Sequence, residues 1–133
     1  MTKMQKLAFF LAIVGLLGGM VVPAFAAGSF TWQCDFADRC LSRDWQTPNT
    51  GTHRVQVYAN ASCPGDGNEY RVRIVRERTF GDDLGEWSRY TCGNGGTKSR
   101  TFSASGTFHF DIEKADTNNT TNVWTLKGET RYP

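Results

Sequence analysis

The sequence lacks the patterns that mark several common functional classes. It holds only two histidines, and no Gly-x-Ser-x-Gly motif occurs, so a nucleophile elbow is not predicted. No two cysteines are separated by two residues, which argues against a cysteine zinc knuckle. Residues 27–133 contain no long apolar run, so we predict no membrane span there. Serine hydrolases with that motif, zinc-knuckle proteins and integral membrane proteins are therefore not expected.

The first 26 residues have the pattern of an export signal. Two lysines precede an apolar run at 7–22, and small residues follow at 22–26. We predict a signal peptide over 1–26, a secreted or extracellular location, and one domain over 27–133. Two of the fifteen basic residues lie in the signal, so thirteen remain, which equals the thirteen acidic residues. A domain without net positive charge is not expected to bind nucleic acid.

All four cysteines lie after residue 26, and an even number in an exported chain predicts two disulfides. Of the three connectivities we favour Cys34–Cys40, which closes a short turn, and Cys63–Cys92, which would tie two strand ends together. A bridge of the second span contributes roughly 3–4 kcal/mol on loop-entropy grounds. The alternative is metal binding by the cysteines together with the histidines. We predict no metal site and no cofactor.

Apolar and polar residues alternate in several short segments, which predicts β-strands. Turn clusters rich in Gly, Asp and Asn separate these segments. The pattern favours an all-β fold, a small antiparallel β-sandwich of about seven strands. Residues 35–45 fit one short turn of helix instead. The predicted strands lie around 30–34, 53–59, 70–74, 86–92, 98–102, 107–113 and 122–130.

Part of the chain resembles small secreted, disulfide-containing β-sandwich proteins of Gram-positive bacteria. The matching segments are Ser62–Gly65, Tyr70–Ile74, Tyr90–Gly93, Gly106–Lys114 and Tyr132-Pro133. The resemblance covers about residues 60–133 and implies a disulfide-tied strand pair and a terminal hairpin. Because such families mostly lack an assigned activity, it implies a fold and not a function.

Four arginines follow one predicted strand, and they have two interpretations. Guanidinium groups in a row could grip an acidic group of a partner. They could equally pair with Asp or Glu on a neighbouring strand, and we favour that interpretation. The four residues are Arg71, Arg73, Arg76 and Arg78.

Two tryptophans stand apart from the strand alternation that fills a core. Trp87 is predicted to point outward if Cys92 is buried, and Trp45 lies in a polar segment. An exposed Trp can stack on a sugar or anchor a protein interface, whereas the alternative is a Trp that covers the open end of the sandwich. We predict one binding surface formed by Trp45, Trp87 and the four arginines.

The histidines are the candidates for acid–base chemistry. His109 lies near Asp111 and Glu113 in strand register and could pair with a carboxylate, although an exposed polar residue on a strand is the favoured interpretation. His53 opens a strand and is predicted to be an edge residue. With Glu77 and the arginines, the histidines supply the residue types of a small secreted ribonuclease, which is the least favoured function.

These features favour a secreted protein that binds a protein partner and is not an enzyme. It would be an adaptor or subunit of an extracellular assembly, such as a multi-subunit secreted toxin, or an inhibitor. The alternatives are a carbohydrate-binding module and an antibacterial toxin that acts by binding. No catalytic residue is predicted, because no catalytic set is complete.

Overall fold

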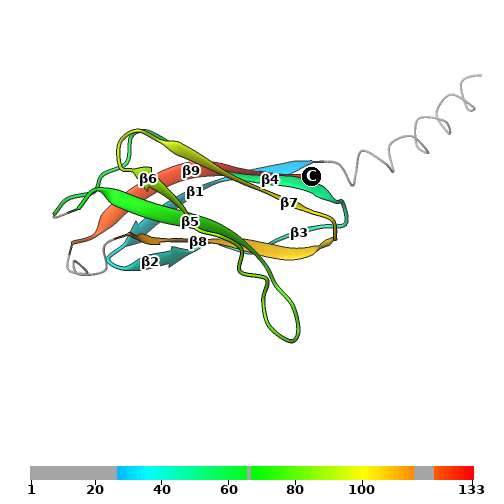
Figure 1. The fold of residues 1–133 in the computed structure, drawn as a ribbon. Coiled ribbons are helices and arrows are strands. Elements are labelled where there is room, and N and C mark those ends of the chain that lie inside the picture. The colour runs from blue at the N-terminus through cyan, green and yellow to red at the C-terminus, as the bar shows by residue number, and fades with distance from the viewer. Residues whose placement is uncertain (1–26, 66, 116–121) are drawn as a thin grey trace, which may run out of the picture.

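A computed structural model describes residues 27–65, 67–115 and 122–133, which fold as two antiparallel sheets facing each other (Figure 1). This confirms the predicted all-β sandwich. The predicted signal, residues 1–26, lies outside the described residues. The strands are β1 (Gly28–Phe36), β2 (Arg39–Leu41), β3 (Trp45–Thr47), β4 (Gly51–Val57), β5 (Glu69–Arg76), β6 (Ser88–Thr91), β7 (Gly96–Phe102), β8 (Gly106–Lys114) and β9 (Trp124–Tyr132).

The first sheet has the order β1-β9-β4-β7, and the second has the order β2-β8-β5-β6. The short strand β3 also belongs to the second sheet, because it pairs with β8 at residues 106–108 while β2 pairs at 111–113. These two strands account for the difference from the seven predicted. They also correct the helical turn predicted at 35–45, since this segment continues β1 and then forms β2.

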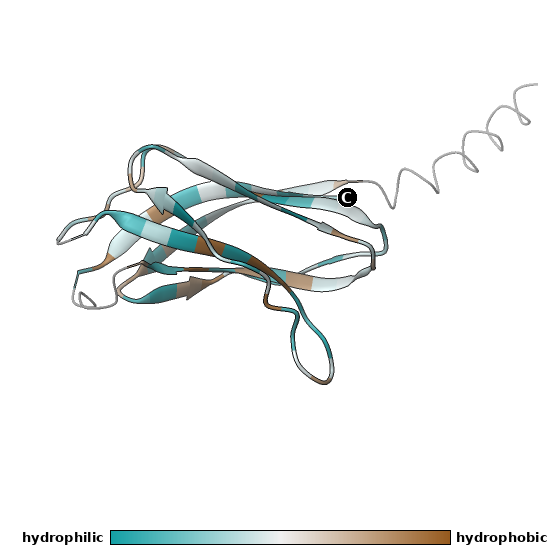
Figure 2. Cartoon of the chain, in the orientation of Figure 1, coloured by the Kyte–Doolittle hydropathy of each residue, from teal (hydrophilic) through white to brown (hydrophobic). Residues whose placement is uncertain are grey.

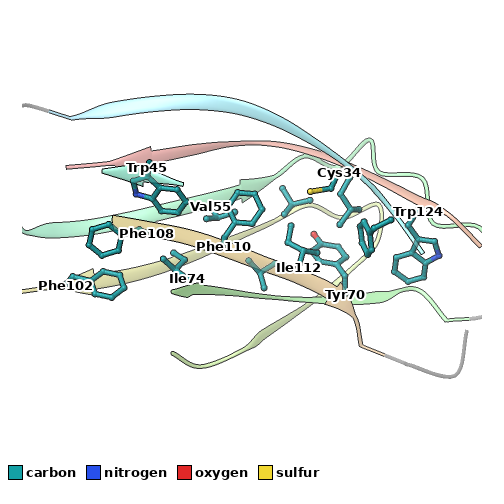
Figure 3. Close-up of a cluster of buried hydrophobic side chains, with 14 residues drawn as sticks. Cys34, Trp45, Val55, Tyr70, Ile74, Phe102, Phe108, Phe110, Ile112 and Trp124 are labelled. Atoms are coloured by element: carbon teal, nitrogen blue, oxygen red, sulfur yellow. The ribbon is translucent and has the colours of Figure 1, made fainter. Parts of the chain in front are cut away.

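The core is the layer of side chains between the two sheets. In β5 the residues Tyr70, Val72 and Ile74 are fully buried, and in β8 the same holds for Phe108 and Phe110 (Figure 3). The alternation of apolar and polar residues places these side chains on the inner faces, as predicted. A fully buried side chain of this size contributes roughly 1.5–3 kcal/mol to stability. Figure 2 shows the hydrophobic positions recurring along these strands.

The two disulfides connect the sheets at opposite edges of the sandwich. Cys34 of β1 is bonded to Cys40 of β2, which joins the outermost strands on one side. Cys63 follows Ser62, which pairs with β9, and is bonded to Cys92 directly after β6. Both predicted pairings are therefore confirmed. Each bridge limits how far the two layers can separate.

Strand β7 belongs to the first sheet but is also bonded to the second. The guanidinium of Arg100 donates to the carbonyl of Ile74 at 2.8 Å and forms an ion pair with Asp83 at 2.6 Å. It passes so close to Gly85 that an added Cβ would lie 2.3 Å from its Nη1. Gly85 has φ +70°, a conformation that also favours glycine. Arg100 thus fixes the segment that follows β5, on which the candidate site is built.

No helix in residues 27–65, 67–115 and 122–133 is long and apolar enough to cross a membrane.

Candidate functional site

Ion pairs cover the outer face of the second sheet, where β5 and β8 run side by side. Arg71 donates to Glu113, with 2.6 Å between Nε and the carboxylate oxygen, and Arg73 donates to Asp111 at 2.7 Å. Both pairs join residues that are directly opposite in the β5–β8 register. Cross-strand pairing, the favoured interpretation of these two arginines, is what the structure shows.

His109 lies between two carboxylates on this face. Its Nδ1 is 3.0 Å from Glu77, and its Nε2 is 3.1 Å from Asp111. The hydrogen bond with Asp111 raises the pKa of His109; burial lowers it by less, and Glu77 adds to the increase. Burial by itself would raise the pKa of Asp111, but His109 and Arg73 outweigh it and hold that pKa below its usual value. The favoured interpretation of His109 as an exposed polar residue is therefore wrong, because the ring is half-buried and contacts carboxylates, as the alternative proposed.

Asp111 is the buried centre of this network. It is only 2% exposed although it lies on the outer face of its sheet. Its carboxylate meets Arg73 on one side and His109 on the other, and Arg39 of β2 approaches to 3.9 Å. A buried carboxylate needs such partners, because an unpaired charge would cost several kcal/mol.

Trp87 lies across the same face, in the segment before β6. The guanidinium carbons of Arg71 and Arg73 lie 4.4 and 4.3 Å from the centre of its ring. The outward direction predicted for Trp87 is confirmed, because these arginines lie on the face opposite to Tyr70 and Val72. The ring is nevertheless half-buried, since the arginines stack on it.

The connection between β5 and β6 carries a feature that the sequence analysis missed. Residues 77–82, which we call the 77–82 loop, project from the sandwich (Figure 1). Phe80 lies in this loop and is 98% exposed, and Leu84 beside the loop is 47% exposed. The signal in the sequence is an aromatic residue directly before the turn glycine Gly81, where alternation has already ended.

Short-range bonds hold the 77–82 loop in place. Arg76 and Asp83 exchange two backbone hydrogen bonds of 3.0 and 2.9 Å, which closes the loop at its base. The backbone N–H of Arg78 donates to the carboxylate of Asp82, and that of Glu77 donates to the carbonyl of Thr107. Because its base and interior are bonded, the loop presents Phe80 in a defined position.

Two of the four predicted binding arginines lie at this loop. Arg76 donates to the carbonyl of Ser105 at 2.9 Å, and Arg78 is exposed. An open hollow lies at the loop base, lined by Arg76, Glu77, Arg78, Thr79 and Thr107. The structure therefore divides the arginines into a paired set on the sheet and a set at the loop.

The prediction that Trp45 belongs to this surface is wrong. Trp45 is 3% exposed and lies in the core beside Phe108 (Figure 3), and it also packs against Phe30 and Tyr132. The physical reason is that it begins β3, whose pairing with β8 turns the side chain inward. A strand of three residues is too short to show alternation, so the polar neighbours gave the opposite impression.

The prediction that His53 is an edge residue is also wrong. His53 is fully buried in β4, between β7 and β9, and its Nδ1 accepts a hydrogen bond of 3.1 Å from the indole N–H of Trp45. Burial lowers its pKa to about 4. Val55 and Val57 share the parity of His53, and that parity could have predicted an inward side chain. Neither histidine is therefore an exposed polar residue, since His53 is fully buried and His109 is half-buried.

The reactive side-chain types of this face are all in contact with other groups. Both ring nitrogens of His109 contact carboxylates, Nδ1 with Glu77 and Nε2 with Asp111. All four cysteines are in disulfides. The ion pairs around Asp111 fix the charged side chains on the outer face of the sheet. The 77–82 loop exposes the apolar side chain of Phe80.

Comparison with known proteins gives a likeness of fold at low similarity. No protein-family model matches the sequence, and no curated protein matches it. Among solved structures, the chain is similar to the Yersinia pseudotuberculosis-derived mitogen YPM, with 8% identity, a TM-score of 0.46, and coverage of 79% of this chain and 84% of that one.

A second similar structure is the N-terminal CBM22-1–GH10 part of the xylanase Xyn10B of Clostridium thermocellum, complexed with xylohexaose. Identity is 10%, the TM-score is 0.42, and the match covers 82% of this chain and 28% of that one. These scores are too low to carry an argument about function. What remains of the predicted resemblance is the disulfide-containing β-sandwich itself.

Proposed function

We propose that this protein is secreted and acts by binding a protein partner, without catalysing a reaction. The observation that carries the proposal is Phe80, an aromatic side chain 98% exposed in a projecting loop. Exposing such a side chain to water has no structural benefit, and aromatic residues anchor protein interfaces. The two disulfides support secretion, because they persist in oxidising compartments.

The proposed interface extends from Phe80 over Leu84 and Arg78 to the half-buried ring of Trp87. The loop that carries Phe80 is closed by backbone bonds between Arg76 and Asp83. A loop already fixed in this way loses little conformational entropy when it binds, which favours affinity. The partner expected for this surface is a protein with an apolar pocket that receives the phenyl ring.

The alternative functions find less support in the geometry. Carbohydrate binding by the two tryptophans would need both rings in one exposed strip, but Trp45 is buried and Trp87 is stacked under two arginines. A hydrolase would need His109 or His53 beside a carboxylate inside a concave pocket. His109 does meet carboxylates, but on an open sheet face, and His53 is sealed in the core.

The proposal is tested by comparing wild type with Phe80→Ser and Leu41→Ser. Leu41 is a matched control, because it is an apolar residue 57% exposed on β2. Each protein is immobilised, incubated with the producing organism's own culture fluid, and the bound proteins are quantified; Kd is then measured with the purified partner. We expect Phe80→Ser to weaken binding roughly 5–150-fold, the range of an interface anchor, and Leu41→Ser to leave it unchanged.

A partner that binds Phe80→Ser as tightly as wild type would overturn the proposed interface. Cleavage of RNA by the purified wild-type protein that is lost in His109→Asn would overturn the non-enzymatic function. Specific retention on a soluble polysaccharide, with no protein partner found, would favour the carbohydrate alternative instead.

A further inference from the structure

Three potential metal ligands from three separate parts of the chain meet beside the 77–82 loop. They are Asp44, in the connection between β2 and β3, Glu77, directly after β5, and His109 in β8. One ligand atom of each lies within 4.8 Å of the others, and Glu77 is 3.0 Å from His109 Nδ1. The described residues contain no other group of this kind.

A second observation concerns how the imidazole of His109 is held. Its Nε2 lies 3.1 Å from Asp111, a carboxylate that is itself 2% exposed and fixed by Arg73. Histidines that bind metals almost always donate the other ring N–H to such a carboxylate, which sets the tautomer and the ring direction. In that tautomer the lone pair lies on Nδ1, the nitrogen that is 3.0 Å from Glu77. A carboxylate thus lies 3.1 Å from the second ring nitrogen, at the position of an outer-sphere partner.

From these contacts we propose that Asp44, Glu77 and His109 bind a divalent metal ion of the zinc class, with Asp111 orienting the imidazole. The proposal departs from the prediction that the chain has no metal site. It stands apart from the proposed partner binding, because Phe80 is not a ligand.

The distances fit a small ion after a modest side-chain movement. Ligands about 2.0–2.1 Å from a tetrahedral zinc ion are about 3.3–3.5 Å apart. Glu77 and His109 are slightly closer than this, and no pair exceeds 4.8 Å. Asp44 is exposed, so its side chain can rotate toward the other two without disturbing the core.

The donor set selects among metal ions. One imidazole nitrogen and two carboxylate oxygens suit Zn²⁺, whereas Ca²⁺ takes six to eight oxygen ligands and Mg²⁺ requires a near-octahedral shell of oxygens. Three protein ligands on an open face leave the fourth position to water or to a side chain of a partner. Because Glu77 forms the base of the 77–82 loop, a bound ion would also tie that loop to β8.

The test is calorimetric titration of Zn²⁺ into the purified, metal-stripped secreted chain with both disulfides formed, at pH 7.5. We expect one equivalent to bind with micromolar affinity, and the melting temperature to rise with Zn²⁺ concentration, since the ion binds the folded chain. Millimolar Ca²⁺ or Mg²⁺ should not displace it. The NMR signals of the His109 ring should shift on zinc addition while those of His53 do not.

Variants assign the site. Glu77→Gln, Asp44→Asn and His109→Asn should each weaken zinc binding at least tenfold, and Glu86→Gln, an exposed carboxylate in the same connection, should not. Asp44→Asn changes only an exposed side chain, so it remains informative if another variant fails to fold. The proposal is overturned if wild type binds less than one equivalent at 100 μM free Zn²⁺. It is equally overturned if Asp44→Asn and Glu77→Gln bind like wild type, or if Ca²⁺ displaces the zinc.

Because partner binding is measured separately with Phe80→Ser, failure of one proposal leaves the other intact. Zinc binding that persists in Phe80→Ser supports the metal site by itself.

Discussion

His53 points into the core of the sandwich and His109 lies on its outer face, and these surroundings shift their pKa values in opposite directions. His53 lies among Phe102, Phe108 and Trp45, where burial lowers its pKa to about 4. His109 lies between Glu77 and Asp111, where its hydrogen bond with Asp111 raises its pKa. Apolar neighbours disfavour the charged ring and carboxylates favour it. The face of the strand, rather than the residue type, decides the charge.

The tryptophans repeat this contrast. Trp45 is surrounded by other aromatic rings of the core and donates its indole N–H to His53. Trp87 packs against the guanidinium groups of Arg71 and Arg73 on the outside. The inner ring stabilises the fold through burial, and the outer ring mainly organises charged side chains. Substitutions on the two faces should therefore have different consequences.

The largest effect is expected for Trp45→Ala, which empties an enclosed part of the core. The free energy of unfolding should fall by about 3–5 kcal/mol, the usual cost of removing a large buried aromatic ring. Urea unfolding with both disulfides intact measures it. Trp45→Phe is the matched control, because it keeps most of the volume and mainly leaves the buried His53 acceptor unpaired, which costs roughly 1–3 kcal/mol. A loss below 1 kcal/mol in Trp45→Ala would show that the ring is not core.

An effect nearly as large is expected from acid, acting through His53. Its pKa of about 4 lies below the value of about 6.5 in the unfolded chain. Between these values the unfolded state binds a proton that the folded state does not, so stability falls as pH falls from 6.5 to 4. The expected loss is about 3 kcal/mol, and above pH 6.5 this contribution is constant.

The variant His53→Asn isolates that contribution, because it retains an acceptor for Trp45 but does not titrate. Urea unfolding of both proteins at pH 7, 6, 5 and 4 should show the wild type losing about 3 kcal/mol more than the variant over this interval. Equal slopes in the two proteins would contradict the buried, neutral state of His53, as would an NMR titration of its ring near pH 6.5.

The smallest effect is expected for Trp87→Ala. Its two cation–π contacts lie on a half-buried surface, where each such contact is worth roughly 0.5–1 kcal/mol. We expect unfolding to become easier by about 1 kcal/mol in total, measured beside Trp45→Ala under identical conditions. Partner affinity should also weaken, but less than in Phe80→Ser. A stability loss above 3 kcal/mol would place Trp87 in the core and remove the contrast between the tryptophans.

The sequence made the long strands and the disulfides predictable because their signals are local or nearly so. Alternation over five or more residues identifies β4, β5 and β8, and the cysteines lie in or beside strands that a sandwich brings together. Alternating charge predicts that arginines of β5 pair with acidic residues of a neighbouring strand, whereas the choice of Glu113 as the partner of Arg71 depends on the β5–β8 register. A sequence records period and residue type, but it does not record the register.

The candidate site was less predictable because it depends on register between distant segments. Glu77 and His109 are 32 positions apart, and only the β5–β8 register shows that they meet. The position of Asp44 is set by the strand β3 that directly follows it, and three residues are too few to show a periodic pattern in the sequence. Phe80 was missed for another reason: a single exposed aromatic residue in a turn has no pattern, and its exposure is known only once the loop is placed.

Strand β1 pairs along its whole length with β9, from Gly28 opposite Tyr132 to Phe36 opposite Trp124. Strands β2 and β3 likewise pair with β8, which comes much later in the chain. Among the described strands, only β5 and β6 are both adjacent in sequence and paired with each other. The hydrogen-bonding partner of β1 is therefore synthesised after all the other described strands. Long-range pairing of this kind is slow to form. If the chain is exported in an extended form, as proposed, the same connectivity would postpone the pairing of β1 until β9 has emerged.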